Sequence, residues 1–161
     1  MRAMGIIAVL PDEEIEALLR TAVVGRIACC AHGRDGSDGR PYVVPLAYGY
    51  DGTAIYAHSA PGRKIRLMRA NPLVSFEVDA AEAPDCWRSV IAEGTYEEIT
   101  ESAARARALE IIYPDPATRP ALPADTIVYR IVLTAKSGRY EVPGNAPAEE
   151  HVDGAARPES A

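Results

Sequence analysis

The most informative segment of this chain reads Tyr56-Ala57-His58-Ser59-Ala60-Pro61-Gly62-Arg63-Lys64-Ile65. Its pattern is that of a strand end, a short turn and the start of a helix with two cations in its first turn. A helix N-terminus already holds partial positive charge and unpaired N–H groups, so cations are unfavourable there unless an anion is bound. Arg63 and Lys64 therefore predict an anion site, most simply for a phosphate. The alternative is a surface Arg/Lys pair on a solvated helix.

The composition of the chain indicates one globular domain. It has 161 residues, of which 48% are hydrophobic and 25% charged, and its net charge is -6. That charge argues against broad electrostatic binding to nucleic acid or to an anionic membrane. Residues 63–69 are a local exception, with four cations and no acid, so we expect their partner to be small. We predict one domain over residues 1–142 and a disordered tail over 143–161, which is rich in Pro, Ala, Glu and Gly.

The cysteines and the N-terminus favour a cytoplasmic protein. Cys29, Cys30 and Cys86 have neither the spacing of a metal site nor an even number for a disulfide framework, so we expect free thiols and no metal. The first nine residues lack the features of a signal peptide, and no apolar run has transmembrane length. Glycine-rich nucleotide loops and the G-x-S-x-G elbow are also absent, which leaves hydrolase and nucleoside-triphosphatase functions without support.

The hydrophobic pattern predicts a mainly β protein of the α+β class, with about six antiparallel strands closed into a small barrel. Pro45 lies inside one expected strand, which predicts a sheet edge, a bulge or a position where no ladder hydrogen bond is made. Asp51-Gly52 predicts a hairpin turn. Gly25 is expected to end the first helix, and Thr100 to cap the third. The strands are expected at residues 26–31, 42–50, 53–58, 73–79, 87–99 and 126–140, and the helices from Pro11, over 62–70 and over 101–112.

Four blocks of sequence, which follow one another along the chain as they do in a known family, carry a resemblance to that family. They are residues 56–65, quoted above, Asn71-Pro72-Leu-Val-Ser-Phe-Glu-Val-Asp79, Tyr42-Val43-Val44-Pro45-Leu46 and Trp87-Arg88-Ser89-Val90-Ile91-Ala92-Glu93-Gly94. Together, over roughly residues 10 to 140, the chain resembles the pyridoxamine 5'-phosphate oxidase superfamily, and within it the branch with nitroimidazole-resistance-type proteins. The resemblance implies a six-stranded antiparallel split β-barrel that forms a homodimer, with flavin mononucleotide (FMN) in a cleft between the subunits.

The resemblance also implies roles for single residues. Arg63 and Lys64 would hold the FMN phosphate, with His58 and Ser59 along the phosphate and ribityl side. The backbone of Val43-Val44-Pro45 would run along the isoalloxazine ring. Ser89, next to Trp87, would be a polar flavin contact. The candidate cofactor-binding residues are Val43, Val44, Pro45, Tyr56, His58, Ser59, Arg63, Lys64, Trp87 and Ser89.

Two departures separate the chain from the vitamin B6 oxidases of that superfamily. The positions near Pro41 and Leu46, where those enzymes carry basic residues, are not basic, and the C-terminal Arg-x-His substrate signature is missing. We therefore expect another small organic substrate, such as a nitro or quinone compound, and electrons from a nicotinamide donor. The alternatives are a non-catalytic flavin-binding or sensor module, and a related barrel that uses deazaflavin F420 or haem.

His58 has two interpretations. Its ordinary titration range suits a proton donor or acceptor beside the substrate, which makes it the candidate catalytic residue. It could equally form a hydrogen bond to the turn or the cofactor without a part in the chemistry.

Overall fold

The computed structural model describes residues 5–33 and 38–144. Most of the expected tail, from residue 145 onward, lies outside the described residues. The helices are α1 (Asp12–Thr21), α2 (Arg63–Ala70) and α3 (Ser102–Ile112), with a 3₁₀ turn η1 (Pro116–Thr118). The strands are β1 (Ile6–Val9), β2 (Val24–Cys29), β3 (Tyr42–Ala47), β4 (Gly49–Tyr50), β5 (Ala54–Ser59), β6 (Leu73–Ala83), β7 (Cys86–Glu98) and β8 (Ile127–Val142).

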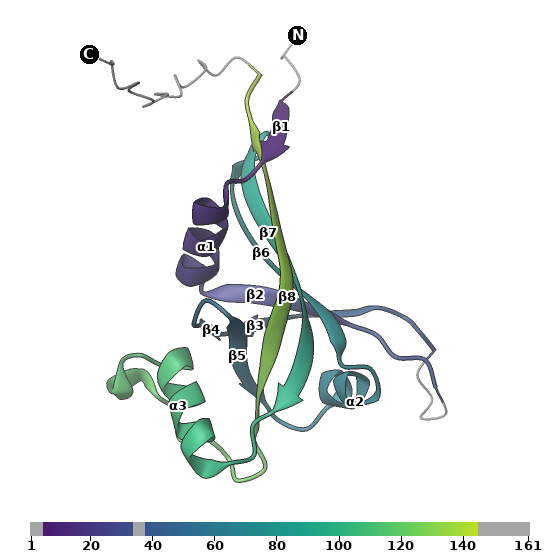
Figure 1. Cartoon of the computed structure of the whole chain (residues 1–161), viewed down its shortest axis with the longest axis vertical. Helices are drawn as coiled ribbons and strands as arrows, with labels where there is room; N and C mark the ends of the chain where they lie inside the picture. Colours follow the sequence, from purple (N-terminus) through teal and green to yellow (C-terminus); the bar gives the residue numbers. More distant parts are fainter. Residues whose placement is uncertain (1–4, 34–37, 145–161) are drawn as a thin grey trace, which may run out of the picture.

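One antiparallel sheet, curled into a half-barrel, forms the body of the molecule (Figure 1). Its strand order is β3-β2-β6-β7-β8-β5-β4, and β1 pairs with β8 outside this path. The mainly β, α+β class is therefore confirmed. Pro45 lies in β3, which is the strand at one end of the sheet. Of the three placements that this proline allowed, the structure shows the sheet edge, where a residue without an N–H costs no ladder hydrogen bond on the open side.

The count of six strands was too low, because the described residues form eight. The additional β1 is a short apolar segment that becomes a strand by pairing with the far end of β8, for example Ile6 with Val142. The expected strand over 42–50 divides at Tyr48. This residue leaves the ladder because its hydroxyl donates to the Leu19 carbonyl at 2.7 Å and its ring meets Phe76 edge to face.

Two helix boundaries also differ from the sequence predictions. α1 ends at Thr21, and Gly25 instead lies buried in β2, where an added Cβ would meet the Phe76 ring at 2.1 Å. This position requires glycine because the Phe76 ring lies against its backbone, and not because a helix ends there. The cap of α3 is Glu101 instead of Thr100, because the Glu101 carboxylate accepts hydrogen bonds from the Ala103 and Ala104 N–H groups.

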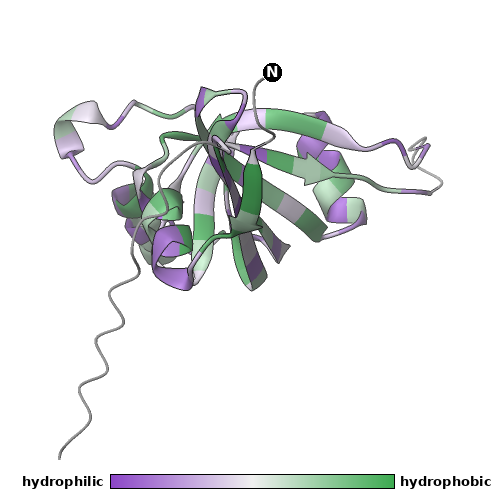
Figure 2. Cartoon of the chain, turned by 90° about the horizontal axis from the view of Figure 1, so that it is seen from above, coloured by the Kyte–Doolittle hydropathy of each residue, from purple (hydrophilic) through white to green (hydrophobic). Residues whose placement is uncertain are grey.

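The inner face of the sheet holds the core. Alternating residues of β2, β6 and β7 are buried, among them Val74, Phe76 and Val78, and Figure 2 shows bands of apolar and polar residues along the strands. The pairing of β7 with β8 has a register shift between Glu93 and Gly94. Among the residues that the structure describes, no helix is long and apolar enough to cross a membrane.

The two ends of the sheet carry different elements (Figure 1). α2 lies at the end of the sheet where β6 begins and β7 finishes, since Leu73 pairs with Thr95. The other end of these strands extends away from the barrel toward β1. α3 packs against β5 and contacts β4 and β8, so it covers the outer side of that part of the sheet.

Candidate functional site

The segment that the sequence singled out forms a corner between β5 and α2, which we call the β5–α2 corner (residues 58–65). Gly62 is the N-cap of α2, has extended backbone and provides no side-chain cap. The first helical hydrogen bond runs from the Arg66 N–H to the Gly62 carbonyl at 3.1 Å. The N–H groups of residues 63–65 precede it and point out of the helix end. No acidic residue occupies the first turn.

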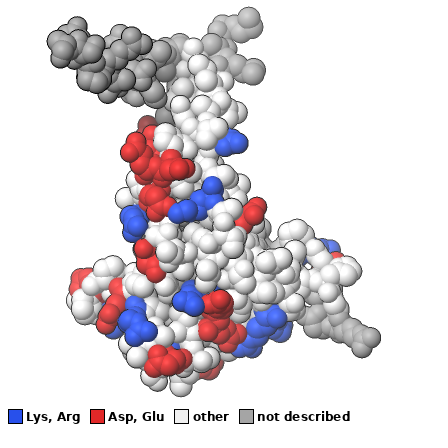
Figure 3. Space-filling view, in the orientation of Figure 1, with Lys and Arg blue, Asp and Glu red and all other residues white. Residues whose placement is uncertain are grey.

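Arg63 and Lys64 lie at this helix start, and Arg63 acts electrostatically on a nearby acid, Asp38. Arg63 is exposed and stacks over the Tyr42 ring at 4.7 Å, and Lys64 is half-buried. Within the described residues neither makes an ion pair, whereas Arg69 in the last turn is held by Glu98 at 2.6 Å. Burial lowers the pKa of Lys64, because desolvation disfavours the ammonium form. Figure 3 shows Lys and Arg side chains gathered over α2. Two cations at a helix N-terminus that make no ion pair among the described residues can hold an anion.

Ser59 and His58 are the last two residues of β5, so the structure brings them to the same corner. The Ser59 hydroxyl donates to the Ala60 carbonyl at 2.8 Å, which leaves its oxygen able to accept a further hydrogen bond. His58 Nε2 lies 2.6 Å from the Tyr113 hydroxyl. Burial, and to a lesser extent the charge of Lys64, lower the pKa of His58, so the imidazole is neutral at physiological pH.

Tyr113 is the residue at this site that the sequence prediction missed. It directly follows α3 and opens the proline-rich loop before β8. No local pattern marks it, because it reaches His58 only through the packing of α3 against β5, across 55 positions of sequence.

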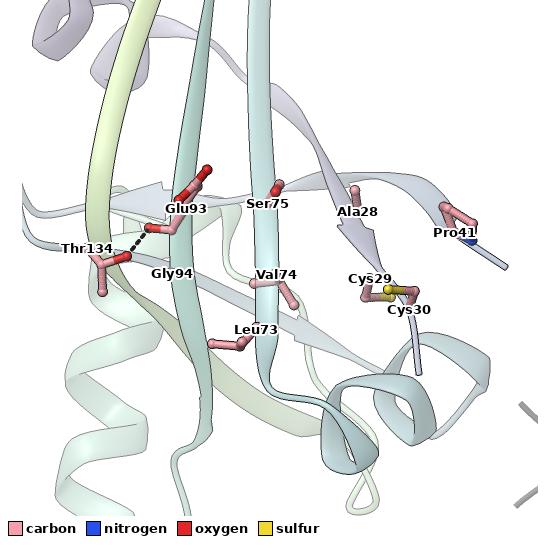
Figure 4. A pocket seen from close by; sticks show the side chains of 10 residues that line it. All are labelled: Ala28, Cys29, Cys30, Pro41, Leu73, Val74, Ser75, Glu93, Gly94 and Thr134. Atoms are coloured by element: carbon pink, nitrogen blue, oxygen red, sulfur yellow. Dashed lines mark hydrogen bonds between the residues drawn. The ribbon is translucent and has the colours of Figure 1, made fainter. Parts of the chain in front are cut away.

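A hollow of about 330 Å³ opens on the outer face of the sheet next to the β5–α2 corner (Figure 4). Ala28, Ser75 and Glu93 stand side by side across β2, β6 and β7 because they are register partners. The remaining lining residues are Cys29, Cys30, Pro41, Leu73, Val74, Gly94 and Thr134.

Cys29 connects this hollow with the two cations. Burial, and then the neighbouring Cys30, raise the pKa of its thiol, while Lys64 and Arg63 act in the opposite direction. The cations therefore lie close to the strand end at which the hollow begins.

The edge strand β3 continues this outer face. Val43 pairs with Ala28 and Pro45 with Arg26, so both are on the side of the hollow, and Val43 is 59% exposed. Val44 pairs with the buried Ile27 and turns its side chain to the core. A ligand on this face can contact the side chains of Val43 and Pro45, but only the backbone of Val44.

Three other predicted residues do not join the corner within one chain. The Tyr56 hydroxyl donates to Asp51 at 2.8 Å and faces a cleft beside α3. Trp87 and Ser89 are on the outer face of the sheet at its far end, where Trp87 pairs with Ala81 and its indole N–H donates to Glu141 at 2.7 Å. Eight residues along β6 separate Ala81 from Leu73, a distance of about 26 Å.

No group of three or more His, Cys, Asp or Glu side chains that could hold a metal ion occurs in the described part of the chain. The three cysteines are free, and only Cys29 is fully buried. The polar chemistry of the site consists of two cations, free N–H groups, a neutral imidazole and hydroxyl groups.

A half-barrel of antiparallel strands with three helices is a split-barrel fold. The family model described as pyridoxamine 5'-phosphate oxidase matches residues 11–140. This chain belongs to that family, as its sequence blocks predicted.

Solved structures show the same fold. An FAD-binding protein from Mesorhizobium loti is 36% identical, with a TM-score of 0.66, over 84% of this chain and 98% of that one. A candidate 5-nitroimidazole antibiotic resistance protein from Bacteroides thetaiotaomicron is 20% identical, with a TM-score of 0.72, over 88% of this chain and 91% of that one. A curated relative, an uncharacterised protein from Rhizobium meliloti (strain 1021), is 34% identical over 93 residues. The match spans 58% of this chain and 58% of that relative.

Proposed function

We propose that this protein binds FMN, with the cofactor phosphate at the start of α2, and acts as a flavin-dependent oxidoreductase. The observation that carries the proposal is the pair Arg63 and Lys64, which make no ion pair among the described residues and lie at a helix N-terminus whose first turn holds no acid. A phosphate there would accept hydrogen bonds from the free N–H groups and from both cations. The FAD-binding protein to which the chain is 36% identical supports a flavin as the ligand.

The hollow on the outer face supports a place for the flavin ring. It begins beside Cys29, next to the cations, and its walls combine the apolar Leu73 and Pro41 with few polar groups. Planar aromatic ligands bind in such partly apolar recesses. The exposed edge of β3 at Val43 and Pro45 would flank the ring, as the family resemblance implies.

Homodimerisation is the second part of the proposal. The outer face of the sheet exposes Val43, Leu73 and Ile91, which are 59%, 68% and 50% accessible. A second copy docked on this face would cover these side chains. It could also bring its own Trp87 and Ser89 to the β5–α2 corner, which a single chain does not do. Each cofactor site would then be built from two chains.

The flavin would supply hydride or electron transfer between a nicotinamide donor and a small organic acceptor, such as a nitro or quinone compound. The residues of this chain would hold the phosphate, cover the ring and exclude water from it. Vitamin B6 oxidation is not proposed, since neither Pro41 nor Leu46 is basic and the C-terminal Arg-x-His signature is missing. Three free thiols fit the reducing cytoplasm, where we place the protein.

The test begins with the purified protein. We expect a yellow preparation with absorbance bands in the near-ultraviolet and blue, and extraction should release FMN. Titrations with FMN, FAD and riboflavin then compare the affinity for a phosphate monoester, for a diphosphate and for a flavin without phosphate. A colourless protein that fails to bind added FMN refutes the proposal, and extracted F420 or haem would replace FMN with that group.

Activity is tested separately by following the oxidation of NADH and NADPH with a nitroaromatic compound or a quinone as acceptor. Turnover with either donor supports an oxidoreductase. Tight FMN binding without any turnover would instead favour a flavin-binding or sensor module.

A further inference from the structure

The hydrogen bond between His58 and Tyr113 connects the β5–α2 corner to the end of α3. The Nε2 to hydroxyl distance is 2.6 Å, and the two rings are tilted by 35° with centroids 5.8 Å apart. Both partners are half-buried. The backbone of Tyr113 is fixed by its N–H, which donates to the Leu109 carbonyl at 2.9 Å. The hydroxyl is therefore held in place by a helix end.

The chemistry of the two groups decides which of them donates. A neutral imidazole has one nitrogen that accepts and one that donates, whereas a phenol can do either. The unprotonated imidazole nitrogen is a far stronger base than a phenol oxygen, so the better hydrogen bond has the Tyr113 O–H donating to Nε2. His58 then carries its proton on Nδ1.

The surroundings of His58 keep this arrangement neutral. The register partner of His58 on β8 is Val128, which is apolar and buried. Tyr113 contacts His58 from the end of α3. The charged group that acts on His58 is Lys64 of α2. Among the described residues His58 Nδ1 makes no hydrogen bond, so its N–H is available to a ligand.

We propose that Tyr113 is a positioning residue of the anion site, which holds the neutral His58 in the Nδ1–H tautomer so that this N–H donates to the phosphate end of the bound cofactor. The inference rests on the proposed function in one respect, the phosphate at the start of α2. It assigns His58 to binding, the second of the two interpretations that the sequence left open. With the opposite tautomer, Nδ1 would present a lone pair to the phosphate and repel it.

The first experiment measures the tautomer directly, without cofactor. Nitrogen-15 NMR distinguishes Nδ1–H from Nε2–H imidazoles, and with three histidines in the chain a His58→Gln variant assigns the signal. We expect the Nδ1–H form in the wild type and a mixture of tautomers in Tyr113→Phe, with the pKa of His58 raised because the bond that stabilised the neutral ring is lost. An Nε2–H signal in the wild type overturns the inference, even where Tyr113→Phe fails to fold.

The second experiment compares FMN with riboflavin, which lacks the phosphate. Tyr113→Phe should weaken FMN binding by about 2- to 10-fold, the effect of one hydrogen bond, and leave riboflavin binding unchanged. Tyr50→Phe is the matched control, because it removes a half-buried hydroxyl that bonds Glu16 and the Gly52 carbonyl away from the corner. An equal loss for both ligands overturns the inference and indicates a purely structural role for Tyr113.

The two experiments separate the inference from the proposed function. Wild-type protein that binds FMN no better than riboflavin refutes the phosphate site itself, and with it the donation from His58. A clear preference for FMN that Tyr113→Phe leaves unchanged preserves the phosphate site and refutes only the part assigned to Tyr113.

Discussion

Arg63 and Lys64 show how one pair of side chains can define a ligand. They add positive charge at the end of α2 where the peptide dipoles already concentrate it, which is unfavourable. Burial also disfavours the charged form of Lys64 and lowers its pKa. A bound phosphate would reverse these costs.

Replacing both residues with alanine should weaken FMN binding by at least about a hundredfold, since each charge-assisted contact contributes roughly 1.5–3 kcal/mol. A fluorescence titration measures the affinity for FMN. Arg66→Ala is the control, because this exposed cation of α2 lies beyond the first free N–H groups. Native affinity in the double variant would contradict the site.

His58 also makes the stability of the fold depend on pH. Its pKa in the folded protein lies below the ordinary value of 6.5, first because of burial and then because of Lys64. On acidification below about 6.5 the unfolded chain therefore binds the proton before the folded one does, and the folded state loses stability.

Urea unfolding of the cofactor-free protein should accordingly show a lower midpoint at pH 5.5 than at pH 7.5. In His58→Gln this difference should shrink, because the group that titrates is gone. An identical pH dependence in both proteins would show that other groups cause it.

At the scale of the element, local sequence predicted the type of most segments but not their ends. The alternation of Val74, Phe76 and Val78 is enough to predict a strand with one buried face. Gly25 was misassigned as a helix end because the close approach of Phe76 is a tertiary contact. Thr100 is a good cap by residue type, yet the backbone places Glu101 at the position where a side chain reaches the free N–H groups.

The cap of α3 can be tested with neighbouring substitutions. Glu101→Ala should lower the urea midpoint with an unchanged m-value, because the Ala103 and Ala104 N–H groups lose their acceptor. Thr100→Ala, one residue earlier, should leave the midpoint where it is. The reverse result would restore the cap that the sequence predicted.

At the scale of the whole molecule, the predicted cofactor-binding residues lie far apart within one chain. Residues that the family resemblance places around one cofactor lie at opposite ends of the sheet, with Arg63 and Lys64 at one end and Trp87 and Ser89 at the other. Two chains that pair through the outer face could reunite them.

Subunit complementation tests this arrangement. A variant with Arg63→Ala and Lys64→Ala is mixed under exchange conditions with a variant that carries Trp87→Ala and Ser89→Ala. Each heterodimer should contain one intact site, so random exchange should restore about a quarter of the FMN sites. The control is each variant alone, which should bind weakly. A mixture that binds no better than its parts would contradict sites built from two chains.

The sequence by itself determined the family, the strand-rich class and the cationic helix start, because these depend on residue type and short-range spacing. Only the tertiary structure decided the pairing of β1 with β8, the division of the strand at Tyr48, the partner of His58 and the separation of Trp87 from Arg63. The first three are contacts between segments far apart in sequence, and the fourth follows from the length of the paired strands β6 and β7. Such contacts depend on how the sheet curls and where α3 packs, and no local pattern of residues encodes them.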